Sequence, residues 1–369
     1  MEVEGGTSCD DGQGTSVQAW VGKHRAFVAK DQEYSDAARE EYARICLGLC
    51  KAAGSLEEAV RALRVGHPGR AGPHLDPAAV MSALGGVMDD QRLSVLVDTL
   101  TNGACVRVVE EGFEWRKGVQ QPPHASAVEH EDELWRSVWK DVRRGGALIL
   151  PSAGAEEILA SVEFSPLGRV DKKDHLGRVK PEGRLIHDIS HGGDASVNAR
   201  TDREVVPAMV LPTLENVVRA VVYWKRKHPN VPVLVTKRDV DAAFRRVPLE
   251  PGGVKFFGAL LGLWAIIMLV LTFGWTNSPP VYALASVAIS TLHRMHRPAD
   301  GERDGMEPFQ SDTYLDDGML VEPALGRRPQ LSAACYEAAM ELVLGPGAVS
   351  SSKKEAEGWL FVVVEWRVA

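Results

Sequence analysis

Two adjacent aspartates, Asp316 and Asp317, stand between apolar residues in the stretch SDTYLDDGMLV. The pattern predicts a β-hairpin that turns at these two carboxylates. Neighbouring carboxylates repel each other and resist burial, so such a pair usually needs a cation between its members. A further carboxylate, Asp239, closes the apolar run VPVLVTKRDV, which is typical of a β-strand. A strand that ends in an acid and a hairpin that turns on an acidic pair can lie side by side in one sheet, which would bring the three carboxylates together.

Three converging aspartates would offer a cation only oxygen ligands. No cysteine or histidine stands within either motif, and this donor set suits Mg²⁺ or Mn²⁺ and not zinc. Two such ions, about 3.5–4 Å apart, are the usual device for in-line phosphoryl transfer, because they activate an attacking hydroxyl and stabilise the leaving oxygen. The residues therefore predict a two-metal site in which Asp239, Asp316 and Asp317 are both catalytic and metal-binding.

The elements that would position these residues follow an α+β pattern from about residue 121 onward. Helical periodicity is found at 129–144 and near 213–228, 278–296 and 329–344. Short apolar runs between the helices are typical of strands. The predicted strands are ALILP, RLIHDIS, VPVLVTKRDV, KFFGALL and LFVVVEWRV.

The N-terminal third shows no pattern that suggests chemistry. Residues 1–30 begin acidic and rich in Gly and Ser, which predicts a disordered lead-in. Residues 31–120 are predicted to be mostly helical, with an unknown role. Ser35 and Gly54 are placed to begin and end one helix, and Ser55 would cap the next.

Composition is that of an ordinary soluble protein, with 45% hydrophobic and 25% charged residues. The net charge of −8 argues against indiscriminate nucleic-acid binding, yet residues 165–255 hold seventeen Lys and Arg against eleven Asp and Glu, which is typical of a phosphate-binding face. The five cysteines are odd in number and complete no zinc pattern, so buried free thiols in a reducing compartment are expected. The expected location is intracellular, either cytoplasmic or nuclear.

The segment FFGALLGLWAIIMLVLTFGW, residues 256–275, carries no charge over roughly the 20 residues that a transmembrane helix needs. Two interpretations are open: a membrane span, or a buried pair of strands that turns at or near Gly262. Polar sequence resumes at once with TNSPP, and no basic cluster flanks one side closely. We therefore favour the buried hairpin and expect no membrane partner.

Several ordered motifs together resemble those of reverse transcriptases. TKRDVDAAFRRVPL, LTFGWTNSPPVY and YLDDGMLV are similar to the three central motifs of that family, and SPLGRVDKKDHLGRVKPEGRLIHDIS is similar to the fingers segment that precedes them. SSKKEAEGWLFVVVEW is similar to the lysine motif and the start of the primer-grip hairpin. The sequences of these motifs are most similar to those of retrotransposon enzymes of the gypsy or DIRS type. The resemblance implies a palm and fingers over residues 121–369, with an antiparallel palm sheet packed on helices and no thumb.

The resemblance also implies roles for residues around the aspartates. Val240 would lend a backbone carbonyl to a metal ion, the amides around Asp241 and Ala242 would face the triphosphate, and the Phe244 ring would exclude a ribose 2′-hydroxyl. Gly274 would let the backbone approach the template–primer closely. The remaining roles are nucleotide binding by Lys172, Lys173 and Arg184, primer or template contact by Tyr314, Trp275 and Ser278, and protonation of the leaving pyrophosphate by Lys353 or Lys354.

The implied function is RNA-directed DNA polymerisation with two Mg²⁺ or Mn²⁺ ions, a dNTP and an RNA or DNA template with an annealed primer; the resemblance implies no protein partner. Where the family usually has Leu-Gly in the primer grip, this chain has FVVVEW.

Two other hypotheses stay open. One is a truncated or decayed reverse-transcriptase-like module that binds nucleic acid without catalysis, and the other is a membrane-associated structural protein built on residues 256–275.

Overall fold

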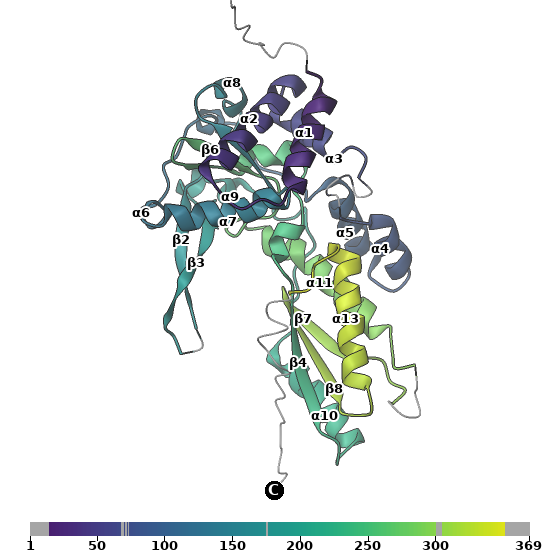
Figure 1. The fold of residues 1–369 in the computed structure, drawn as a ribbon. Helices are drawn as coiled ribbons and strands as arrows, with labels where there is room; N and C mark the ends of the chain where they lie inside the picture. Colours follow the sequence, from purple (N-terminus) through teal and green to yellow (C-terminus); the bar gives the residue numbers. More distant parts are fainter. Residues whose placement is uncertain are drawn as a thin grey trace, which may run out of the picture.

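The computed structural model describes residues 15–350, apart from 68, 69, 71, 73, 175 and 300–304. An upper part combines the first helices of the chain, up to residue 64, with one three-stranded sheet, and a lower part surrounds a second three-stranded sheet (Figure 1). Helices and small antiparallel sheets are mixed along the chain, so the predicted α+β class is confirmed. The predicted strand LFVVVEWRV, Lys353 and Lys354 lie outside the described residues.

The N-terminal region forms helices that begin and end at residues suited to capping. Ser35 accepts a hydrogen bond from the Ala38 N–H, and Gly54 ends the same helix in the left-handed conformation (φ 82°). Ser55 caps the next helix in the same way. The helices are α1 (Val17–Ala29), α2 (Asp36–Ala53), α3 (Leu56–Arg64), α4 (Pro77–Leu84) and α5 (Asp90–Asn102).

The prediction of disorder through residue 30 is wrong over α1. This helix buries Val21 and Phe27 against the rest of the molecule. The Gly- and Ser-rich composition that suggested disorder belongs to the first residues only, whereas an apolar face recurs at helical spacing from Val17 onward.

The apolar segment 256–275 contains an antiparallel pair of strands, as the hairpin interpretation expected. β5 (Gly258–Leu261) pairs with β6 (Trp264–Met268), and Gly262 (φ 59°) lies in the turn between them. β1 (Ala147–Pro151) pairs with the other edge of β6 and completes the upper sheet, in the order β1-β6-β5. The interpretation of 256–275 as a membrane span is therefore wrong. Over the described residues, no helix has the length and apolar character to cross a membrane.

A long two-stranded hairpin projects from the upper part, beside the lower one (Figure 1). It consists of β2 (Leu167–Lys173) and β3 (Val179–His187). Glu133 of α7 (Glu131–Arg143) holds its base, because this carboxylate accepts hydrogen bonds from Arg169 Nε and from the Gly183 N–H. Beyond this anchor the hairpin is mostly exposed.

The lower sheet has the order β4-β8-β7, formed by β4 (Val233–Asp239), β8 (Asp317–Pro323) and β7 (Ser311–Tyr314). Helices α11 (Ser278–Arg294) and α13 (Arg328–Leu344) cover one face of it. Helix α10 (Leu214–Lys227) covers part of the other face, where Trp224 packs in a small apolar cluster and donates to the Val321 carbonyl. All three helices lie where the sequence periodicity placed them.

One large hydrophobic cluster runs from α1 through both parts of the molecule to Ala348. The N-terminal helices thus share a core with the strands and are not an independent appendage. Cys46 and Cys50 are free thiols within this core, as expected, and burial raises the pKa of Cys50 to about 12. Short helices in the described part of the chain are also found at η1 (Glu114–Arg116), α6 (Ala125–Val128), α8 (Glu156–Leu159), η2 (Gly193–Ala195), α9 (Val197–Arg200), η3 (Ala243–Arg246) and η4 (Pro251–Phe256).

Candidate active site

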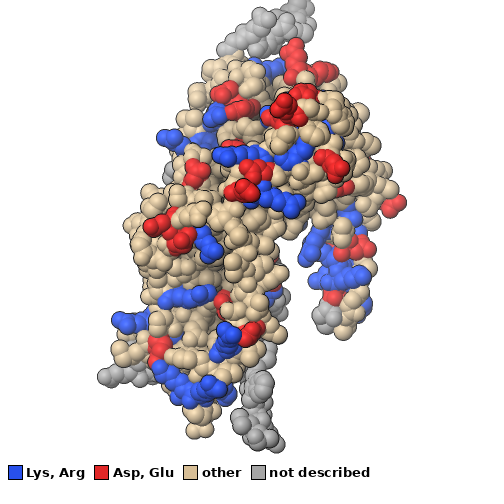
Figure 2. All heavy atoms as spheres, turned by 180° about the vertical axis from the view of Figure 1, so that it is seen from behind, with Lys and Arg blue, Asp and Glu red and all other residues tan. Residues whose placement is uncertain are grey.

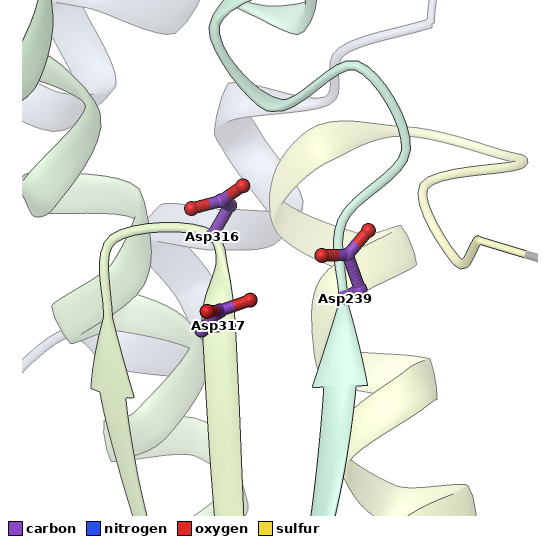
Figure 3. Close-up of side chains that lie close together, drawn as sticks. All are labelled: Asp239, Asp316 and Asp317. Atoms are coloured by element: carbon purple, nitrogen blue, oxygen red, sulfur yellow. The ribbon is translucent and has the colours of Figure 1, made fainter. Parts of the chain in front are cut away.

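Three carboxylates meet at one end of the lower sheet. Asp239 is the last residue of β4 and Asp317 the first of β8, and the two are directly opposed in the antiparallel register. Asp316 stands in the turn just before β8 (Figure 3). Each side chain has an oxygen within 4.8 Å of the others. The convergence predicted from the sequence is therefore present.

Strand alternation explains why these side chains remain uncovered. Side chains two apart on a strand point to the same face, so Lys237 and Asp239 share the face of Val233 and Val235. Helix α10 packs over the Val233 end of this face and lies away from the Asp239 end (Figure 1). Asp239 and Asp317 are half-buried and Asp316 is exposed, so ions and substrates can reach the carboxylates.

The turn that carries Asp316 is tight and conformationally strained. Tyr314 pairs with Asp317 across it, and Leu315 has a left-handed backbone (φ 54°), which costs a non-glycine residue about 1–2 kcal/mol. Two hydrogen bonds hold the turn in place: Ser286 Oγ donates to the Leu315 carbonyl at 2.7 Å, and the Val240 N–H donates to the Asp316 carbonyl at 3.3 Å. The second bond ties the turn to the residue that follows Asp239.

Two further groups beside the carboxylates were not singled out from the sequence. Lys237 Nζ lies 2.8 Å from Asp317 Oδ1, so an ammonium group partly neutralises the cluster. Its position two residues before Asp239 on a predicted strand could have identified Lys237 from the sequence, because that spacing gives a shared face.

Tyr282 of α11 is fully buried, and burial together with the charges of Asp316 and Asp239 raises its hydroxyl pKa well above the usual 10. Its hydroxyl has no hydrogen-bond partner among the described residues.

The segment after β4 differs from the expectation in one respect. The Asp241 N–H donates to the Ala348 carbonyl at 2.9 Å, so this amide is not available to a triphosphate and that assignment is wrong. The Asp241 side chain accepts instead from Arg144 Nη2, at 2.8 Å. Ala242 follows in the left-handed conformation (φ 53°), half-buried at the start of η3. Its proposed amide contact stays a prediction, as does the carbonyl ligand from Val240.

Phe244 forms part of the main core and keeps 9% of its surface exposed. Its ring lies 4.9 Å from that of Phe273 and 5.4 Å from that of Tyr282, measured between centroids. The charges of Asp316 and Asp239 act on the Tyr282 hydroxyl, so Phe244 packs against a residue that lies within electrostatic range of the aspartate cluster. Its role in selecting deoxyribose stays a prediction.

Contacts within the protein already require a glycine at position 274. Its φ is +121°, and a Cβ at this position would lie 1.9 Å from the His187 carbonyl oxygen. Asn198 Nδ2 also donates to the Gly274 carbonyl, at 2.7 Å. The close approach that the sequence assigned to template–primer is thus made by the end of β3.

Two predicted primer or template contacts are wrong, because both side chains are buried. Trp275 is 2% exposed and donates to Thr201 Oγ1 at 3.2 Å. Ser278 is 1% exposed and donates to the Thr272 carbonyl at 2.8 Å. Tyr314 differs from them, with 49% of its surface exposed, and remains accessible to a nucleic acid.

The predicted nucleotide-binding cations all lie on the β2–β3 hairpin. Lys173 and Arg184 are exposed and Lys172 is half-buried, and none of the three forms an ion pair within the described part of the chain. Lys and Arg gather on this hairpin, the arm at the lower right of Figure 2, and an open gap separates it from the lower part of the molecule. The cations therefore do not touch the carboxylates, and contact with a shared ligand stays a prediction.

No protein family and no curated protein matches this sequence in the comparisons made. Among solved structures, the protease–reverse transcriptase of prototype foamy virus is similar, with 15% sequence identity and a TM-score of 0.37. The match covers 63% of this chain and 24% of the viral chain, so this chain spans about a quarter of that protein's length. A likeness this loose identifies neither the fold family nor the activity.

Proposed function

We propose that the protein is a nucleotidyltransferase of the reverse-transcriptase type, which extends a primer with dNTPs by two-metal catalysis. The observation that carries this proposal is the convergence of Asp239, Asp316 and Asp317 at adjacent strand ends, with oxygens within 4.8 Å of one another. The order of the surrounding sequence motifs supports it. Assignment of the protein to a gypsy- or DIRS-type element is part of the same proposal and rests on the motif sequences alone.

The donor set fits Mg²⁺ or Mn²⁺, because it consists of carboxylate oxygens at one solvent-accessible point. When bound, two such ions would activate the primer 3′-hydroxyl and stabilise the leaving pyrophosphate. The chain's own part is to hold three negative charges at fixed positions. The β4–β8 register fixes Asp239 against Asp317, and the Ser286 and Val240 hydrogen bonds fix the turn that presents Asp316.

In the proposed reaction the primer 3′-hydroxyl releases its proton to solvent water as its oxygen forms a bond to the α-phosphorus of the dNTP, and the bond from that phosphorus to the bridging oxygen breaks. Pyrophosphate leaves. Phe244 would border the sugar, and the cations of the β2–β3 hairpin would meet the triphosphate across the gap. The template, RNA or DNA, would lie in that gap with Tyr314 accessible at its edge.

A second candidate function is nucleic-acid binding without catalysis. The observation that favours it is the ion pair between Lys237 and Asp317, which supplies a positive charge to the cluster without a metal ion. In this alternative the exposed cations of the hairpin hold nucleic acid and the carboxylates are structural.

Primer extension by the 1–369 chain separates the two functions. With Mg²⁺ or Mn²⁺, low salt and an annealed primer, we expect incorporation of the templated dNTP. Asp316→Asn removes one negative charge without changing the side chain's size, so it should lower the rate by about 100-fold or more. Asp312→Asn is the matched control, because Asp312 lies on β7 and pairs with Arg294.

Equal extension by the parent chain and Asp316→Asn would exclude the two-metal assignment. Primer–template binding by the parent chain without extension under either metal would instead establish the binding module.

A further inference from the structure

A cavity of about 570 Å³, lined by none of the three clustered aspartates, lies between the N-terminal helices and the rest of the molecule. Its walls come from α1, α3, the end of α7, the η3 segment and the residues after β6. This volume is within the range of sites that enclose small organic ligands. Nothing in the proposed polymerase reaction uses it.

Six arginines line this cavity: Arg25, Arg64, Arg143, Arg144, Arg245 and Arg246. Four of them are paired with carboxylates, Arg143 with Asp31, Arg245 with Asp141, and both Arg144 and Arg246 with Asp241. Three carboxylates thus face six guanidinium groups. The cavity therefore carries an excess of about three positive charges, and an anion entering it would be stabilised.

Arg64 is the most informative of these residues. It is 8% exposed, and its Nη1 has no hydrogen-bond partner among the described residues. Among the described residues its guanidinium makes one hydrogen bond, a long one of 3.4 Å from Nη2 to the Leu269 carbonyl. Burial and the charge of Arg61 lower its pKa to about 10. A buried guanidinium without a counter-charge is costly, and an anionic ligand would remove that cost.

Arg25 is an exposed arginine of the same cavity lining. It donates to the backbone carbonyls of Leu63 and Val65, at 3.0 and 2.7 Å. These bonds hold its guanidinium beside α3 without neutralising its charge. A ligand anion in the cavity would therefore be attracted by the exposed Arg25 and Arg144 as well as by the buried Arg64.

The rest of the lining is largely apolar. Val28 and Val60 contribute from α1 and α3, Leu269 from the segment after β6 and Leu344 from the end of α13. Such walls suit a ring and do not suit a purely ionic ligand. Three histidines also line the cavity, and burial disfavours the charged form of two of them, lowering the pKa of His24 to about 4 and that of His67 below its usual value.

We propose that this cavity binds a nucleoside polyphosphate, with its phosphates toward the arginines and its base against the apolar wall, at a site separate from the aspartate cluster. The site needs no divalent ion, because arginines supply the positive charge. Arg144 would be shared between this ligand and Asp241, which stands two residues after Asp239. The proposal does not depend on polymerase activity.

Binding of ATP to the 1–369 chain in buffer free of divalent ions tests this site. Isothermal titration should give saturable binding of one ATP per chain, tighter than that of tripolyphosphate, and none for adenosine. Arg64→Met should weaken ATP binding about tenfold or more, because a charged contact is lost. Arg136→Met is the matched control, since Arg136 is an exposed arginine of α7 outside the cavity, and it should bind as the parent does.

Arg144→Met provides a second variant should Arg64→Met fold poorly, because Arg144 is exposed; it too should weaken ATP binding. Asp316→Asn should leave ATP binding unchanged, which distinguishes this site from the proposed active site. The absence of saturable binding, or equal affinity in the parent and Arg144→Met, would overturn the proposal. Tripolyphosphate binding as tight as that of ATP would overturn the nucleotide assignment.

Discussion

At the scale of single residues, Lys237 bears on whether the aspartate cluster binds metal ions or is neutralised by a lysine. Its ammonium group lies 2.8 Å from Asp317, on a side chain that is still 43% exposed. Exposed pairs of this kind are worth at most about 1 kcal/mol. Such a contact is weak enough for a divalent cation to displace, so the ion pair is compatible with catalysis.

Lys237→Met should therefore lower the Mg²⁺ concentration at half-maximal primer extension, because a competitor for Asp317 is removed. About 1 kcal/mol corresponds to a shift of up to about fivefold. A Mg²⁺ titration of the extension rate measures it. Lys227→Met is the control, since Lys227 lies at the end of α10, away from the cluster, and pairs there with Glu307. A higher Mg²⁺ requirement in Lys237→Met would mean that the lysine assists cation binding.

Phe244 is the residue on which sugar selection is expected to depend. Phe244→Val should open space beside the proposed nucleotide and raise ribonucleotide incorporation relative to deoxyribonucleotide by about tenfold. Single-turnover incorporation of matched ribo- and deoxyribonucleotides measures the ratio. Phe273→Val removes the neighbouring, more exposed ring and should leave selection unchanged. Identical selection in Phe244→Val and the parent chain would assign Phe244 to the core alone.

At the scale of elements, the structure separates what local sequence predicts from what tertiary contact decides. The strand ending in Asp239 and the hairpin turning at Asp316 follow from short-range patterns, apolar runs bounded by turn residues. The burial of Trp275 and Ser278 does not, because it depends on Thr201 and on the fold of the preceding loop. The family resemblance assigned these two residues a role that their local sequence could not test.

Gly274 belongs to this scale, because it joins two elements. Gly274→Ala should destabilise the protein by about 3 kcal/mol or more, since the new Cβ would overlap the His187 carbonyl oxygen and φ is positive. Urea unfolding measures the loss. Gly154→Ala is the control: Gly154 also has a positive φ (+84°) but nothing within 4 Å of its Cβ position, so about 1 kcal/mol is expected. Equal losses in the two variants would show that the His187 contact is relaxed at no cost.

At the scale of the whole molecule, one core joins the N-terminal helices to both sheets. The sequence indicated that residues 31–120 are helical but not where they dock, because amphipathic helices reveal a buried face without its partner. The same limit hid the arginine-lined cavity, whose members are far apart in sequence and meet only in the folded chain. The Asp241 amide was misassigned for a related reason: its partner, Ala348, lies near the other end of the described chain.

The central claim is that Asp239, Asp316 and Asp317 together hold two divalent cations during nucleotide transfer. Electron paramagnetic resonance of Mn²⁺ tests it most directly, in a complex of the 1–369 chain with a dideoxy-terminated primer, its template and the matching dNTP. The account predicts two Mn²⁺ ions per chain with mutually coupled spectra, and loss of that coupling in Asp316→Asn, because one of the three negative charges that would hold the ions is gone. The same Mn²⁺ count and coupling in Asp316→Asn as in the parent chain, or no Mn²⁺ beyond that held by the free nucleotide, would contradict it.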